Sequence, residues 1–356
     1  MPNILFATNR TPTLGPDGKP TGFGDAALDP APGNLYCGTA VVEGTDAQDA
    51  NAGKLDGLLN LNHGAFAPEA VAPVLASQND VLVFVHGTDN SFNDAVLRAA
   101  YNREWISQGG PVIDLILFTW PARSYGNYIN LIADHADYNE DQRQAGLTPY
   151  AFHLFLDQLR VLQPHLGKRR LHLLCHSMGN FMLADAIDQL FAADAQPALP
   201  QFDEIILAAA DEDFRSLHFE GGRRLSNLWR LGREITVYFN NDDALMVLSQ
   251  SPFVNNVLRL GYNGPPDKPD LNVFPTRVYE FVDCTGVNDS LSNAPLSSHQ
   301  YYRESPTVRT DIVATLAGKV PQRLKYDAAA NVYSLFPPPA LLASAGPGDR
   351  GTGVGS

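Results

Sequence analysis

The chain has 356 residues, of which 44% are hydrophobic and 18% are charged, and its formal net charge is -14 at pH 7. This composition is typical of a folded globular protein and excludes a disordered chain. The negative charge disfavours nucleic acid and anionic membrane surfaces as partners, because both would repel it. The three cysteines, Cys37, Cys175 and Cys284, are too few and too widely spaced to predict a disulfide framework or a zinc site.

The first residues, MPNILFATNRTP, lack the basic segment and long apolar run of a secretory signal. No stretch of the sequence approaches the roughly 20 apolar residues that are needed to cross a bilayer. We therefore expect no membrane span and a cytoplasmic location.

Short apolar runs bounded by turn residues recur along the chain. Near the start, ILFA (4–7) and GTAVV (38–42) predict added strands at one edge of a sheet. The later runs are those expected of strands buried on both faces, as in a parallel sheet covered by helices. They are VLVFV (81–85), VIDLILF (112–118), LHLLC (171–175), EIILAAA (204–210), EITVYF (234–239) and RVYEFV (277–282).

Helical patterns lie between these runs. The clearest is TPYAFHLFLDQLRVL (148–162), where Thr148 is the expected N-cap, Pro149 fits the first helical position and apolar residues recur at helical spacing. SFNDAVLRAAYNREWI and NFMLADAIDQLF show a similar pattern. Alternating strands and helices predict an α/β fold with a doubly wound, mostly parallel sheet. We expect one domain over residues 1–330, irregular up to about residue 75, and a disordered, Pro/Gly-rich tail over residues 331–356.

Ser177 lies between a predicted buried strand and a predicted helix, in LHLLCHSMGNFM. This is the placement of a nucleophile elbow, a tight strand-to-helix turn with the usual pattern G-x-S-x-G. Here the pattern is C-H-S-M-G, with Gly179 kept and Cys175 in place of the first glycine. The turn would raise Ser177 above the carboxyl end of the sheet and present the Met178 N–H to a developing oxyanion. The alternative is an ordinary turn in which the serine caps a helix.

A second signal is VLVFVHGTDNSF, where His86 and Gly87 directly follow another apolar strand. In hydrolases of this architecture, the loop after such a strand supplies a second oxyanion donor. Glycine lets the backbone come close to a ligand there. We therefore expect the Thr88 N–H to bind the oxyanion together with the Met178 N–H.

A serine nucleophile needs a histidine base and an acid that orients it, in the chain order Ser, acid, His on this fold. Only His218 and His299 follow Ser177. His299 comes after the last predicted strand and is the expected base, whereas His218 lies in a polar stretch before the run at 234–239. The acid should follow a strand between the serine and His299. The aspartates in such positions are Asp211, Asp213, Asp242 and Asp243.

Together these motifs resemble the α/β-hydrolases, and in particular DUF900, a bacterial family of uncharacterised, esterase/lipase-like α/β-hydrolases. The matching pieces are, in order, FATNRTP, VFVHGTDNSF, LFTWPA, LLCHSMGN, ILAAADEDF, DDAL and HQYY. The resemblance implies a Ser-Asp-His triad. Aligning DDAL with the D-x-A-L run of the family implies that Asp242 is the acid, with Asp243 as the second candidate.

The expected reaction is hydrolysis of a small-molecule carboxylic ester through an acyl-enzyme. His299 would take the proton of Ser177 while Asp242 holds the imidazole. The N–H groups of Thr88 and Met178 would bind the oxyanion. The reaction requires no metal or organic cofactor. Amide or thioester cleavage, or acyl transfer to another acceptor, would use the same residues, and a binding protein with a vestigial site is the remaining alternative.

The segment 122–146, ARSYGNYINLIADHADYNEDQRQAG, is aromatic at one end and acidic at the other. It is a candidate for part of a rim or cap over the site. A solvated connector with a short helix is the equally weighted alternative.

Overall fold

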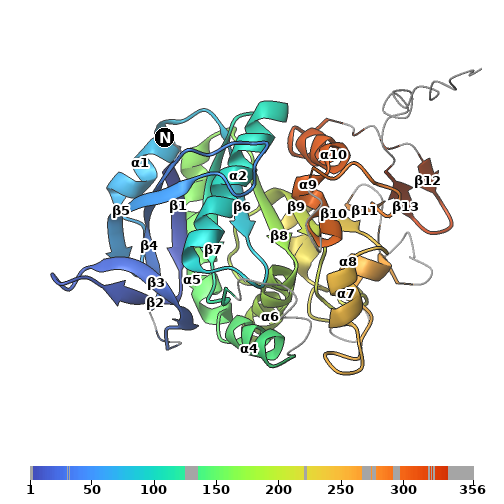
Figure 1. The fold of residues 1–356 in the computed structure, drawn as a ribbon, viewed down its shortest axis with the longest axis horizontal. Coiled ribbons are helices and arrows are strands. Elements are labelled where there is room, and N and C mark those ends of the chain that lie inside the picture. Colours follow the sequence, from blue (N-terminus) through green and yellow to red (C-terminus); the bar gives the residue numbers. More distant parts are fainter. Residues whose placement is uncertain are drawn as a thin grey trace, which may run out of the picture.

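The structure is a computed structural model that describes residues 3–335, except 30, 32, 125–134, 220–222, 267–273, 275–277, 292–296, 320, 322 and 324. In this part of the chain, one eleven-stranded sheet runs through the molecule in the order β12-β13-β11-β10-β9-β8-β6-β7-β1-β4-β5 (Figure 1). A second sheet pairs β2 with β3. The strands are β1 (Asn3–Thr8), β2 (Arg10–Leu14), β3 (Pro20–Ala27), β4 (Tyr36–Glu43), β5 (Lys54–His63), β6 (Asp80–Val85), β7 (Ile113–Thr119), β8 (Leu171–His176), β9 (Phe202–Ala208), β10 (Gly232–Phe239), β11 (Tyr279–Asp283), β12 (Lys325–Asp327) and β13 (Val332–Ser334).

The predicted strands are confirmed. The six apolar runs correspond to β6 through β11, with bounds that shift by at most about two residues; residue 277, where the last run begins, lies outside the described residues. These six strands are parallel to one another, and β1 is parallel to β7. The two early runs form β1 and β4 near one end of the sheet, as expected, and the two strands pair antiparallel. Parallel strands place all their carboxyl ends along one edge, where ligands bind in such folds.

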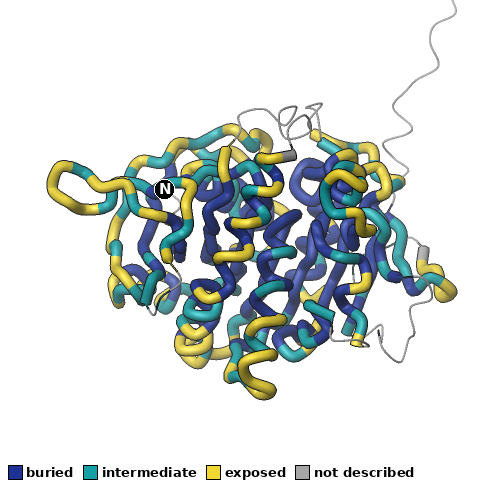
Figure 2. Tube along the Cα trace, turned by 90° about the horizontal axis from the view of Figure 1, so that it is seen from below, coloured by how far each residue is buried: buried dark blue, intermediate teal, exposed yellow. Residues whose placement is uncertain are grey.

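Helices cover both faces of the sheet. The apolar side chains of α2, α9 and α10 pack on one face, and those of α1, α4, α5 and α6 pack on the other. Figure 2 shows the strands as a buried layer inside a more exposed shell. The helices are α1 (Pro68–Ala76), α2 (Phe92–Gly109), α4 (His135–Gly146), α5 (Pro149–Leu162), α6 (Met178–Ala193), α7 (Ala244–Ser249), α8 (Leu260–Asn263), α9 (Tyr301–Glu304) and α10 (Pro306–Leu316).

The three predicted helices are present as α2, α5 and α6, and their N-termini show how local sequence sets their starts. Ser91 caps α2 in a capping box with Asp94. Thr148 occupies the N-cap of α5 and Pro149 its first position, as predicted. The Thr148 hydroxyl makes no cap bond, however, because it donates to the carbonyl of Gln144 at 2.9 Å.

The predicted boundary between domain and tail is wrong by a few residues. Val332–Ser334 form β13, which pairs with β11, and Leu335 is buried. Apolar side chains therefore continue the sheet past residue 330, and the Pro/Gly-rich composition begins only after them. The rest of the predicted tail, residues 336–356, lies outside the described residues. A single domain stays a prediction.

Within the described ranges, no helix has both the length and the apolar character that a membrane crossing requires. The cytoplasmic location stays a prediction.

Candidate active site

Ser177 lies on a tight turn between β8 and α6. The strand ends at His176, the helix begins at Met178, and Ser177 between them has φ 54° and ψ -128°. A positive φ is strained for a residue with a Cβ and persists only where the surroundings hold it. Here the Ser177 N–H donates to the Ala208 carbonyl at 3.0 Å, and its carbonyl accepts from the N–H groups of Asn180 at 2.9 Å and Asp211 at 3.2 Å. The turn therefore has the geometry expected of the elbow.

Two glycines let the backbone pack closely around this serine. A Cβ on Gly179 would lie 2.5 Å from the His86 carbonyl oxygen, so only glycine fits where α6 passes the end of β6. A Cβ on Gly87 would lie 2.6 Å from the Cβ and 3.2 Å from the Oγ of Ser177. The loop after β6 thus lies directly against Ser177. The two predicted motifs meet in space, although about 90 residues separate them in the sequence.

Cys175, which replaces the first glycine of the elbow pattern, is fully buried in the core beneath the turn. Burial raises the pKa of its thiol well above the ordinary value. The side chain therefore packs as an apolar group.

His299 lies in a short 3₁₀ turn (Ser297–His299) and pairs with Asp243, not with Asp242. The His299 Nδ1 and the Asp243 Oδ2 are 2.7 Å apart, and both side chains are buried. Asp243 is also the N-cap of α7, where its Oδ1 accepts from the N–H groups of Leu245 at 3.0 Å and Met246 at 3.1 Å. One carboxylate oxygen fixes the helix start and the other reaches the histidine.

The implied choice of Asp242 as the acid is therefore corrected. Asp242 is exposed, and its N–H donates to the Asn240 Oδ1 at 2.9 Å. The physical reason is that the side chain of Asp243, as the cap of α7, folds back onto the helix start, whereas Asp242 lies one residue earlier and does not cap the helix.

The remaining candidates from the sequence do not contact His299. Asp211 forms a buried ion pair with Arg259 at 3.2 Å. Asp213 accepts from the N–H of Arg215 in a surface turn. His218 packs its ring edge-on against Phe274, with 5.4 Å between ring centroids.

Two reactive atoms of this cluster have no hydrogen-bond partner among the described residues. They are the Ser177 Oγ and the His299 Nε2, and both are buried. His176, next to the serine, connects the two residues: its ring lies 4.8 Å from the His299 ring, and its Nε2 is 3.2 Å from the His299 carbonyl oxygen. Burial, and then the nearby His299, holds the pKa of His176 well below its ordinary value, so this ring stays neutral.

Sequence reasoning missed a buried polar network that joins three of the quoted motifs. Arg10, from FATNRTP, donates to the Thr119 Oγ1 at 3.0 Å and to the carbonyl oxygens of Asn90 at 2.7 Å and Ala122 at 2.9 Å. The His86 Nε2 lies 2.9 Å from the same Thr119 Oγ1. Burial lowers the pKa of Arg10 to about 10, which leaves the guanidinium charged at neutral pH. Through His86 and the Asn90 carbonyl, the network fixes the loop that follows β6.

The described part of the 122–146 segment includes α4, which packs against α6 and is not a solvated connector (Figure 1). Its buried residues include Tyr138 and Asp141. The Tyr138 hydroxyl donates to the Asp211 Oδ2 at 2.5 Å, and the Asp211 N–H donates to the Ser177 carbonyl. This helix therefore lies beside the catalytic edge. Residues 125–134 lie outside the described residues.

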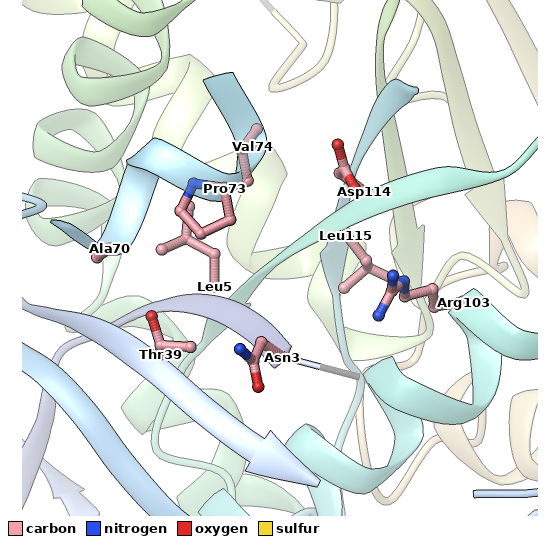
Figure 3. A pocket seen from close by; sticks show the side chains of 9 residues that line it. All are labelled: Asn3, Leu5, Thr39, Ala70, Pro73, Val74, Arg103, Asp114 and Leu115. Atoms are coloured by element: carbon pink, nitrogen blue, oxygen red, sulfur yellow. The ribbon is translucent and has the colours of Figure 1, made fainter. Parts of the chain in front are cut away.

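A separate pocket lies at the opposite edge of the sheet. Figure 3 shows its lining side chains, which come from β1, β4, β7, α1 and α2. Asn3 begins β1 and Asp114 is the second residue of β7, so the pocket lies at the amino ends of parallel strands. Ser177 follows the carboxyl end of β8. The pocket is therefore not part of the candidate active site.

The doubly wound sheet, with a serine on a tight turn between β8 and α6, is that of the α/β-hydrolase fold. Residues 47–318 match the DUF900 family, described as an alpha/beta hydrolase of unknown function. The chain belongs to this family, which confirms the resemblance drawn from the sequence. No curated protein matches the sequence.

Several solved structures are similar at low identity. Esterase B from Lactobacillus rhamnosis is 12% identical, with a TM-score of 0.37 over 68% of this chain and 78% of that chain. A cold-adapted esterase from an Arctic intertidal metagenomic library is also 12% identical, with a TM-score of 0.36 over 80% and 94%. The RedJ thioesterase of Streptomyces coelicolor is 11% identical, with a TM-score of 0.30 over 69% and 91%. These likenesses are too distant to transfer a substrate to this chain.

Proposed function

We propose that this protein is a serine hydrolase that cleaves small-molecule carboxylic esters through an acyl-enzyme intermediate. The observation that carries the proposal is the combination of a strained elbow serine with a buried His299–Asp243 pair. The Ser177 Oγ and the His299 Nε2 lack a partner among the described residues. Buried polar atoms without partners are uncommon and call for an explanation. A substrate-dependent proton transfer between them supplies one.

In the first half-reaction, the Ser177 Oγ attacks the ester carbonyl carbon while the His299 Nε2 takes the hydroxyl proton. Asp243 accepts from the protonated Nδ1, which keeps the lone pair on Nε2 and stabilises the imidazolium that forms. The carbonyl oxygen becomes an oxyanion. It is bound by the Met178 N–H, at the first residue of α6, and by the Thr88 N–H in the loop after β6.

The tetrahedral intermediate then collapses. The bond to the alcohol oxygen breaks, the alcohol leaves with the proton from His299, and an ester of Ser177 remains. Water attacks this ester, with His299 again accepting and returning the proton, and releases the carboxylic acid. No metal or organic cofactor takes part in this sequence.

Amide or thioester cleavage and acyl transfer to another acceptor remain alternatives, because they use the same residues in the same roles. A non-catalytic binding protein is less well supported. Such a protein has no use for a buried carboxylate that orients a buried histidine beside a strained serine, and strain of this kind concentrates at functional sites.

The proposal is tested with p-nitrophenyl esters of several acyl lengths and with matched anilides. We expect ester hydrolysis by the wild type. His299→Ala should lower kcat by roughly 10³- to 10⁵-fold, because no base accepts the serine proton. His218→Ala is the matched control and should stay within about 3-fold of wild type, since the His218 ring packs against Phe274, away from Ser177 and His299. An inactive His218→Ala beside an active His299→Ala would contradict the assignment. Anilides cleaved faster than esters would identify an amidase.

A further inference from the structure

Asp141 of α4 is a buried carboxylate that faces the loop after β6. Its side chain is fully buried. The Oδ2 accepts from the Thr88 Oγ1 at 2.5 Å and from the Asp89 N–H at 3.4 Å, and the Oδ1 accepts from the Arg123 N–H at 3.0 Å. The carboxylate therefore gathers donors from the loop itself and from the segment after β7.

Asn90 and Arg10 hold the same loop from another side. The Asn90 side chain donates to the carbonyl oxygens of Thr88 at 2.6 Å and Gly87 at 3.1 Å. Arg10 holds the Asn90 carbonyl in turn. The Thr88 N–H lies in the same planar peptide group as the Gly87 carbonyl, which accepts from Asn90. With this carbonyl held by Asn90 and the Thr88 hydroxyl held by Asp141, the N–H has little freedom to rotate.

The charges on the two sides of the loop are complementary. Arg10 and Asp141 are both fully buried, and the charge of Asp141, after that of Asp25, favours the protonated form of Arg10. Burying a carboxylate is unfavourable unless hydrogen bonds and an opposite charge compensate for the lost hydration. A neutral side chain would anchor α4 at lower cost. A charged Asp141 is therefore better explained if it serves to hold the loop after β6 in one conformation.

We propose that Asp141 is a positioning residue for the oxyanion hole: through the Thr88 hydroxyl it holds the Thr88 N–H in the orientation that binds the oxyanion. The inference rests on the proposed function and deepens it. It makes the docking of α4 a requirement for the chemical step, because the helix supplies the group that orders the loop. A donor that is already oriented stabilises the transition state far more than one that must reorient during the reaction.

A double-mutant cycle of Thr88 and Asp141 tests this positioning role, with kcat and KM measured on an ester that the wild type hydrolyses. Thr88→Val and Asp141→Ala should each lower kcat by roughly 10- to 100-fold, the range expected for a misplaced donor, with KM changed by less than about 3-fold. The double variant should be no slower than the slower single variant, because both changes break one contact. Thr88→Ser, which keeps the hydroxyl, should stay within about 3-fold of wild type.

Arg143→Ala is the control on the same helix, since Arg143 is exposed and pairs with Glu140. It should leave kcat unchanged, and Tm is measured for every variant. Losses that multiply in the double variant, that appear only in KM, or that follow the folded fraction would overturn the inference. Ser177→Ala in the same series separates the two proposals. If Ser177→Ala stays active, the proposed function is wrong. If Ser177→Ala is inactive while Asp141→Ala keeps full kcat, only the role of Asp141 is wrong.

Discussion

Replacing Ser177 with alanine should lower kcat for ester hydrolysis by at least ~10⁴-fold, because it removes the nucleophile on which the two half-reactions depend. The fold should not change. The Ser177 Oγ has no hydrogen bond to any described residue, and alanine has the same backbone cost at φ 54° as serine. Steady-state kinetics and thermal unfolding of the same preparation measure both effects.

Ser251→Ala is the matched control for this experiment. Ser251 also has a buried Oγ without a partner among the described residues, but it lies past α7 and not on the elbow. It should keep near wild-type kcat. A Ser177→Ala preparation that is free of wild-type enzyme and keeps more than a tenth of the activity would mean that another group is the nucleophile.

Asp243→Asn should lower kcat on the order of 10³- to 10⁴-fold, whereas Asp242→Asn should have little effect. The amide of an asparagine can present its NH₂ group to the His299 Nδ1. That contact would place the ring proton on Nε2, where it blocks acceptance of the Ser177 proton. Asparagine is also a good N-cap, so α7 should remain intact and stability should change little.

The pair of variants is measured on one ester, with Tm as the check on folding. A large loss in Asp242→Asn with an active Asp243→Asn would restore the reading taken from DDAL. Mild and equal losses in both variants would point to an acid on another loop.

The strands β6 through β11 could be predicted from the sequence because each is a mostly apolar run between turn residues. β6 and β8 are buried along almost their whole length, so the pattern needed no knowledge of neighbours. The end of the sheet was harder to predict. β13 has three residues of intermediate burial, and it pairs with β11, which is distant in the sequence. No local sequence pattern predicts such a pairing.

Ser177, Gly87 and His299 could be found because chain order and adjacency to buried strands constrain them. The acid could not be chosen on that basis, since Asp242 and Asp243 are neighbours and satisfy the same condition. Side-chain direction decides between them. A usable signal was present: an aspartate directly before the apolar run ALMVL is the pattern of a helix N-cap. Read as a cap, that pattern would have favoured Asp243.

The contacts that hold the loop after β6 could not be predicted from the sequence. The Thr88 hydroxyl meets Asp141 across 53 positions, and Arg10 meets the Asn90 carbonyl across 80. Neither contact belongs to a helix or a strand ladder, so no periodicity connects the partners. Only the folded chain brings α4 and the segment after β1 to the same loop.

Labelling with a fluorophosphonate probe tests the central claim most directly, because phosphonylation requires a serine activated by its histidine. Intact-mass and peptide analysis of the wild type should find one adduct, on Ser177. The adduct should be absent from Ser177→Ala and should form much more slowly in His299→Ala. A wild-type protein that takes up no label, or that carries it on a different residue, would contradict the account.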